Sequence, residues 1–207
     1  MPTVIGDFEH SLAHALSARA PRQSEASEGR AAAVLIPVLD GAEPALLLTL
    51  RTETVSTHKG QISFPGGSLE PGERPEKAAL REAREEIGLD PSQVRVLGQL
   101  DETPTFVSGY VITPFVGWVS AQPFLEANPS EVAALIVAPI AKLTEEIRVE
   151  PGFVHDGFNY PTEAWIYEGH IIWGVTARLL RMFLGLLAGA GLAAAPGETA
   201  SPWPVSQ

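Results

Sequence analysis

The spacing of apolar residues along the chain predicts several helices. They cover about residues 4–19, 75–87 and 175–187, and a further short helix opens near Pro139. The first is amphipathic, because its apolar residues recur at helical spacing: Ile5, Phe8, Leu12 and Leu16. The second begins with Pro75, which is tolerated in a first turn, and is followed by Gly88, which favours a helix end.

Short apolar runs between these helices predict strands, because each run is bounded by Gly, Pro or Asp. The predicted strands are 33–39, 45–51, 61–64, 94–100, 110–119 and 132–137, with shorter ones around Phe153 and over 165–167. Strands outnumber helices, so we expect an α+β fold in which helices pack outside a sheet.

The pattern also divides the chain. Residues 1–30 are expected to form an N-terminal helix and a polar linker, and residues 31–188 a single domain. Residues 189–207 are rich in Ala, Gly and Pro, and we expect this tail to be disordered.

Composition and charge narrow the class of protein. The 207 residues carry a formal net charge of −11, so we expect neither a nucleic-acid nor an anionic-membrane partner. There is no cysteine, which excludes disulfides and thiolate metal sites and fits a cytoplasmic protein. The N-terminus lacks the features of a signal peptide, and the apolar run 182–195 is shorter than the ~20 residues of a membrane span.

The helix over 75–87 carries the candidate chemistry. Glu82, Glu85 and Glu86 are spaced i, i+3 and i+4, so we expect their carboxylates to share one face. The opposite side, with Leu80, Ala83 and Ile87, is expected to pack on the sheet. Crowded carboxylates repel one another unless a cation lies among them, and oxygen ligands suit Mg²⁺ or Mn²⁺. The alternative is a solvated acidic helix face.

Two neighbouring features favour the metal site over that alternative. Arg81 lies four residues before Glu85 and can pair with it along the helix. Gly66 and Gly67, ahead of the helix, permit a close approach of the backbone that a side chain would block.

Residues 67–89 resemble the Nudix box, GX5EX7REUXEEXGU, where U is a bulky apolar residue. The fixed positions are all matched, by Gly67, Glu73, Arg81, Glu82, Glu85, Glu86, Gly88 and Leu89, and only Ala83 is smaller than the usual U. The resemblance implies the Nudix fold, a mixed β-sheet sandwiched between α-helices. It also implies metal-dependent hydrolysis of a nucleoside diphosphate linked to another moiety.

The same resemblance suggests roles for the matched residues. Glu82 and Glu86 are the expected principal metal ligands, Glu85 a further ligand or the base, and Glu73 and the Gly67 carbonyl the edge of the metal shell. Arg81 is expected to orient a glutamate. Family members differ in which glutamate is the base, so Glu85 and Glu86 both remain candidates. Glu131 is either a cap or a distal ligand or base.

The run 46–67, LLLTLRTETVSTHKGQISFPGG, is similar to the signature of the coenzyme A pyrophosphatase branch, although Ser56 replaces a frequent Arg. Residues 128–132 and 172–177 resemble further segments of that branch. This resemblance implies cleavage of coenzyme A or its thioesters to 3′,5′-ADP and 4′-phosphopantetheine or its acyl derivative. Arg51, His58 and Lys59 are the expected substrate-binding cations.

Other activities stay open at this stage. They are an ADP-ribose or nucleotide-sugar pyrophosphatase, a nucleoside triphosphate sanitiser, and a non-catalytic nucleotide-binding module, which usually lacks some of the box glutamates. The expected partner is in each case a small molecule, and the oligomeric state, including a homodimer, is left open.

Overall fold

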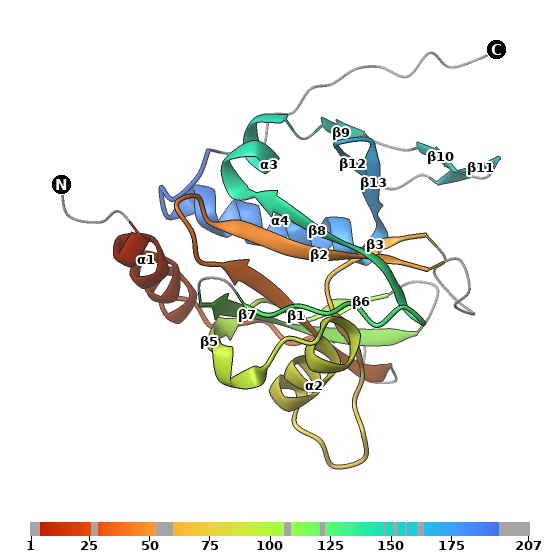
Figure 1. Ribbon diagram of the computed structural model, residues 1–207, viewed down its shortest axis with the longest axis horizontal. Helices are drawn as coiled ribbons and strands as arrows, with labels where there is room; N and C mark the ends of the chain where they lie inside the picture. The colour runs from red at the N-terminus through yellow and green to blue at the C-terminus, as the bar shows by residue number, and fades with distance from the viewer. Residues whose placement is uncertain are drawn as a thin grey trace.

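The computed structural model describes residues 5–25, 29–52, 60–105, 109–120, 123–146, 148–150, 153–155, 157–160 and 164–194. Its helices are α1 (Ile5–Ser17), α2 (Pro75–Ile87), α3 (Ile140–Glu146), α4 (Gly174–Gly189) and a 3₁₀ turn, η1 (Pro91–Gln93). The fold is a mixed sheet with helices on both sides (Figure 1).

An eight-stranded sheet forms the centre of the molecule. Its main path runs β3 (Ile62–Ser63), β2 (Ala45–Arg51), β1 (Arg30–Leu39), β7 (Tyr110–Val119) and β5 (Val94–Gln99). Three strands branch from it: β4 (Gly66–Ser68) pairs with β1, β6 (Thr103–Pro104) with β7, and β8 (Val132–Pro139) with β2. The β1–β7 pair is parallel, and the other pairs of this sheet are antiparallel.

Smaller sheets follow later in the chain. β10 (Phe153–His155) pairs with β11 (Phe158–Tyr160), while β12 (Ala164–Tyr167) lies between β13 (His170–Trp173) and β9 (Arg148–Glu150).

Both faces of the central sheet are buried. Successive side chains of a strand point to opposite faces, so alternate residues of one strand belong to two different cores. In β2, Leu46 and Leu48 join a core that also contains residues of α1 and α4, whereas Leu47 joins a second core with α2. Ile36 and Leu35 of β1 divide in the same way. The predicted sheet between helices is therefore confirmed.

The first core includes α1 as an integral part. Leu12 and Leu16 are buried in it, together with Leu100 and Trp118 of the sheet region. At the other end of the chain, α4 ends at Gly189 and Leu192 still packs against the same core. Residues 195–207 of the expected tail lie outside the described residues.

The structure differs from the sequence expectations mainly at strand ends and short strands. β1 begins at Arg30, three residues before the predicted start at Ala33. Ile172 and Trp173 close β13, and α4 begins at Gly174, one residue before the predicted start at residue 175. Gly174 has a φ of 64°, a left-handed conformation that suits the change from strand to helix.

No helix among the described residues is long and apolar enough to cross a membrane.

Candidate active site

The candidate site lies where α2 meets β4 and the end of β2. β4 pairs antiparallel with β1, and this pairing sets Gly66 opposite Val34 and Gly67 opposite Ala33. β2 ends at Arg51. α2 itself starts at Pro75 and ends at Ile87, where Gly88 caps it with a left-handed φ of 68° and an N–H that donates to the Arg84 carbonyl. These boundaries fix which α2 residues face β4.

The three clustered glutamates of α2 are buried to very different depths. The side chain of Glu86 is 3% exposed, that of Glu82 17% and that of Glu85 58%. Glu86 is therefore buried like Ala83 and Ile87, although only the opposite side of α2 was expected to pack on the sheet. The reason is that β4 and the end of β2 extend over this turn of α2, and both make contacts with Glu86.

Arg81 holds most of the acidic residues of the site. Its Nε and Nη2 donate to the two carboxylate oxygens of Glu73, at 2.9 Å each. Its Nη1 donates to Glu82 Oε1 at 2.8 Å and to Glu85 Oε2 at 3.2 Å, and Nη2 also reaches the Ser68 carbonyl at 3.1 Å. The predicted Arg81–Glu85 pair is therefore present, but Glu73 and Glu82 are the closer partners. These contacts fix the positions of the carboxylates before any ligand binds.

Gly67 allows β4 to lie directly against Glu82. A Cβ atom at this position would fall 2.5 Å from the Glu82 Cδ and Oε1 atoms. Only glycine permits this approach of backbone to carboxylate. The Gly67 backbone and the Glu82 side chain, both predicted to hold a metal ion, thus lie against each other.

Glu86 has two polar contacts in its buried position. Arg51 Nη1 donates to its Oε1 at 3.4 Å, and the Gly66 N–H donates to its Oε2 at 3.3 Å. Arg51 was expected to bind substrate, and the structure places it in direct contact with a predicted metal ligand.

Burial raises the pKa values of both enclosed glutamates. The pKa of Glu86 is raised to about 7, mainly by desolvation, and the Arg51 charge and the Gly66 N–H oppose the shift. The pKa of Glu82 is also raised by burial, against the effect of Arg81. Glu131 adds to both shifts through its charge, so it lies within electrostatic reach of the pair. For both carboxylates the cost of burial thus exceeds the stabilisation by the neighbouring arginine.

The pKa of Glu73 shifts in the opposite direction. The hydrogen bonds from Arg81 and from the Glu70 N–H lower it, and those from Arg81 to Glu73 raise the pKa of Arg81. For Glu73 the two bonds from Arg81 thus outweigh the effect of burial, whereas for Glu82 and Glu86 burial outweighs the effect of their arginines.

The oxygen donors of the site suit a divalent cation, although the described side chains are not already arranged to coordinate one. Within the described ranges, no three acidic or histidine side chains are grouped closely enough to hold a metal ion as they stand. Each box glutamate is instead engaged by Arg81 or Arg51. Glu82 and Glu86 nevertheless combine hard oxygen donors with burial that raises their pKa values despite these arginines, and a bound cation would favour their ionised forms.

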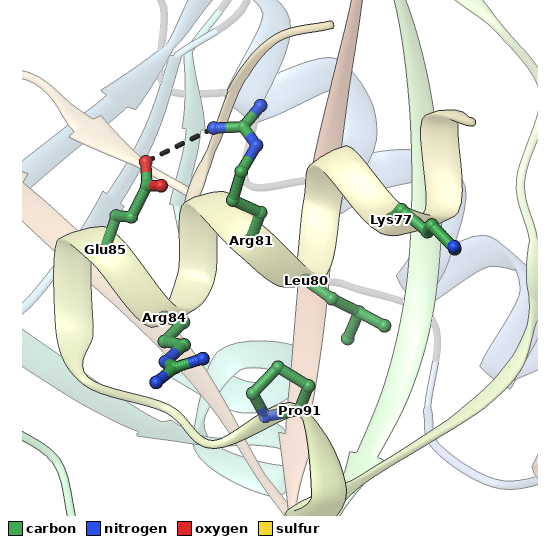
Figure 2. Close-up of a pocket in the computed structure, with 6 residues that line it drawn as sticks. All are labelled: Lys77, Leu80, Arg81, Arg84, Glu85 and Pro91. Atoms are coloured by element: carbon green, nitrogen blue, oxygen red, sulfur yellow. Dashed lines mark hydrogen bonds and ion pairs between the residues drawn. The ribbon is translucent and has the colours of Figure 1, made fainter. Parts of the chain in front are cut away.

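An open hollow of about 490 Å³ lies beside the site, on the outer side of α2. Figure 2 shows Lys77, Leu80, Arg84 and Pro91 around it, with the Arg81–Glu85 ion pair at its edge. Leu80, expected to pack on the sheet, is half-buried: it touches the α2 core and lines this hollow.

Some of the predicted site residues are not among those that the structure describes. His58 and Lys59, and also Ser56, lie outside the described residues. Two main-chain groups at the site, the Gly66 N–H and the Ser68 carbonyl, are not predictable from the sequence, because a backbone group leaves no trace in residue type. The adjacent glycines Gly66 and Gly67 were the one feature of the sequence that could have indicated the contact from the Gly66 N–H.

Comparisons with known proteins agree on one family. The family model described as the NUDIX domain matches residues 29–156. Two uncharacterized Nudix hydrolases named NudL, from Yersinia pestis and Yersinia pseudotuberculosis, are each 40% identical over 154 residues, which is 73% of this chain and 77% of theirs.

Solved structures give weaker likenesses. An Ap4A hydrolase from C. elegans superposes with a TM-score of 0.45 at 18% identity, over 53% of this chain and 80% of its own. The Nudix hydrolase RenU from M. smegmatis reaches 0.43 at 27% identity, over 55% and 72%. These scores are too low to add to the family assignment.

Proposed function

This chain belongs to the Nudix hydrolase family, and from that premise we propose that it cleaves the diphosphate of coenzyme A or its thioesters. The products would be 3′,5′-ADP and 4′-phosphopantetheine or its acyl derivative. The observation that carries the hydrolase part is the pair of enclosed carboxylates, Glu82 and Glu86, placed against the glycines of β4.

Nudix hydrolases use divalent metal ions, and we propose Mg²⁺ or Mn²⁺ here. Glu82 and Glu86 would hold the ion, with the Gly67 carbonyl and Glu85 at the edge of its shell. When bound, such an ion stabilises negative charge on a diphosphate and makes a coordinated water more acidic.

The chain's own residues prepare this site. Arg81 holds Glu73, Glu82 and Glu85 in fixed positions through its guanidinium. A proton from the attacking water would be accepted by Glu85 or Glu86. Glu85 is the more exposed of the two and Glu86 the one whose pKa is raised to about 7, and both remain candidates for the base.

The coenzyme A part of the proposal rests on the similarity of residues 46–67 and 172–177 to that branch of the family. Arg51, from the first of these segments, lies beside Glu86, where it can meet a phosphate of a bound diphosphate. His58 and Lys59, from the same segment, are proposed as further contacts to the substrate's phosphates.

A side-by-side rate comparison tests the proposal. Coenzyme A, ADP-ribose, NADH and a nucleoside triphosphate are each incubated with Mg²⁺ and with Mn²⁺, and kcat/KM is measured for every pair. We expect coenzyme A to be the best substrate. If kcat/KM for ADP-ribose exceeds that for coenzyme A by about tenfold, corresponding to ~1.4 kcal/mol in transition-state binding, the coenzyme A assignment is wrong.

The matched control for this comparison is Glu82→Gln, which removes one charge from the pair and keeps the size of the side chain. It should lower kcat by at least ~10²-fold without unfolding the protein. Absence of turnover by the unsubstituted protein on the whole panel would overturn the enzymatic proposal and favour a nucleotide-binding module.

A further inference from the structure

Arg51 occupies an unusual position for a residue expected to bind substrate. It is the last residue of β2, and the two-residue period of a strand sets it on the same face as Leu47, the face covered by α2. Its Nη1 lies 3.4 Å from Glu86 Oε1, and the two side chains are 21% and 3% exposed. A positive charge is thereby placed against the most buried carboxylate of the site.

Glu86 requires such a charge whenever it is ionised. A buried carboxylate without a cation is strongly destabilising, and its other polar contact, from the Gly66 N–H, is long at 3.3 Å. Arg51 is the nearest described cation to Glu86, since Arg81 is directed to Glu73, Glu82 and Glu85. A divalent ion on the same carboxylate would be repelled by the guanidinium, so the two cations compete for Glu86.

A second observation concerns the other end of the guanidinium. The Nε atom of Arg51 is buried and has no hydrogen-bond partner within the part of the chain that the structure describes. A buried donor without an acceptor is unfavourable, and native structures rarely keep one unless a ligand or water completes it. A phosphate oxygen is the acceptor that a guanidinium binds best.

We propose that Arg51 takes the place of the metal ion on Glu86 when no metal is bound, and that metal binding releases its guanidinium to hold a phosphate of the substrate. The inference rests on the proposed metal-dependent hydrolase, and it adds that metal binding promotes binding of the substrate phosphate. Metal and substrate phosphate bind cooperatively, because the same residue must leave Glu86 before it can bind the phosphate.

The test compares the unsubstituted protein with Arg51→Gln, Arg51→Lys and a control, Arg84→Gln, which removes an exposed cation of α2 that makes no described contact with the glutamates. Thermal unfolding is followed at about pH 8 in EDTA and in MgCl₂, and the Kd for Mg²⁺ is measured by calorimetry. Arg51→Gln should melt at a lower temperature in EDTA, gain more from MgCl₂ than the unsubstituted protein, and bind Mg²⁺ at least about threefold more tightly. Arg51→Lys and Arg84→Gln should bind Mg²⁺ as the unsubstituted protein does.

The second readout is binding of imidodiphosphate, a diphosphate that is not hydrolysed. The unsubstituted protein should bind it in MgCl₂ at least about tenfold more tightly than Arg51→Gln does, and this difference should disappear in EDTA. If Arg51→Gln does not fold in either condition, Arg51→Lys serves instead. Lysine keeps the charge but lacks the Nε donor, so Mg²⁺ binding should be retained and imidodiphosphate binding reduced.

The outcomes separate this inference from the proposed function. A metal-induced rise in melting temperature that is equal in Arg51→Gln and the unsubstituted protein overturns the role of Arg51, as does unchanged imidodiphosphate binding in Arg51→Lys. Failure of the unsubstituted protein to bind Mg²⁺, and equally Mn²⁺ in its place, overturns the metal-dependent hydrolase itself.

Discussion

Gly66 and Gly67 are adjacent in β4, but the absence of a side chain is required for a different reason at each position. A Cβ at Gly66 would overlap the main chain of β1, at the Ala33 carbonyl oxygen and at Val34 Cα, 2.7 Å away. A Cβ at Gly67 would meet the carboxylate of Glu82 instead. Main-chain atoms in a sheet cannot move aside, whereas a side chain can take another rotamer.

Alanine at these two positions should therefore separate stability from activity. Gly66→Ala should lower the free energy of unfolding by about 2 kcal/mol or more, because β1 and β4 must part. Gly67→Ala should stay folded but lose at least ~10-fold in kcat/KM, because Glu82 is displaced. Urea unfolding and steady-state kinetics measure the two effects.

The control for both glycine variants is Gly185→Ala in α4, where the added methyl group meets open space. It should leave activity unchanged and stability equal or slightly higher. Full activity in Gly67→Ala would contradict the close contact of Gly67 with Glu82.

For individual residues, the sequence predicts which side chains lie close together at the site but not how far each is buried. The helical spacing of Glu82, Glu85 and Glu86 brings them to neighbouring positions on α2, as expected. Their burial depends on what covers the helix: β4 from one direction, and residues 126–128 from another, where the Asn128 N–H donates to the Glu86 carbonyl. Such long-range coverage has no local pattern in the sequence.

Among the elements, α1 shows how much of the core a terminal helix can supply. Leu12 is fully buried between the helix and the sheet, and Phe8 packs against the same core at 6.2 Å from the Trp118 ring, measured between centroids. The helix was predicted from its apolar spacing, and this spacing also identifies the buried face.

Leu12→Ala should lower the free energy of unfolding by about 2–5 kcal/mol, since it leaves a cavity in a packed core. His10→Ala, on the exposed side of the same helix, should change it by less than about 0.5 kcal/mol. Denaturant titration of both variants gives the comparison. Equal effects of the two substitutions would mean that α1 is not part of the folded core.

The elements that the sequence analysis missed are those too short to show a period. β4 and β6 span three and two residues, and neither contains enough positions for an alternation to be visible. They exist because β1 and β7 present partners to them. The long strands were predicted closely, and β2 and β7 have the predicted bounds, because both faces of the sheet are buried and apolar.

For the molecule as a whole, Asp101 fastens the segment after α1 to the sheet. It accepts hydrogen bonds from the Arg22 N–H at 3.0 Å and from Arg22 Nε at 3.1 Å, and it also pairs with Arg19. Burial alone would raise the pKa of Asp101, but the Arg22 N–H and the Arg19 charge outweigh it and lower the pKa below 3.8. The ionised form is thus favoured in the folded protein.

A lowered pKa makes this contribution depend on pH in a defined direction. It is fully present above the unfolded pKa of 3.8 and is lost as the pH falls through the lower folded value. Asp101→Asn should therefore cost about 1–3 kcal/mol near pH 7, and the difference from the unsubstituted protein should shrink below pH 3.8. Urea titrations over that range measure it.

Glu43→Gln, in the exposed turn between β1 and β2, is the matched control and should have little effect at any pH. A cost of Asp101→Asn that stays constant down to low pH would show that its charge is not what stabilises the protein.

The parallel pairing of β1 with β7 joins Arg30 to Tyr110 across 110 − 30 = 80 residues of chain. The residues in direct side-chain contact at the glutamate site, from Arg51 through Gly67 to Glu86, are contained in that closed loop. Closing it has a large entropic cost before any contact is gained, and folds with such distant pairings form slowly. During synthesis β1, β2 and β4 are made before α2, but β1 has no parallel partner until residue 119 has left the ribosome, so the acidic helix is made before the sheet that is to bury it is complete.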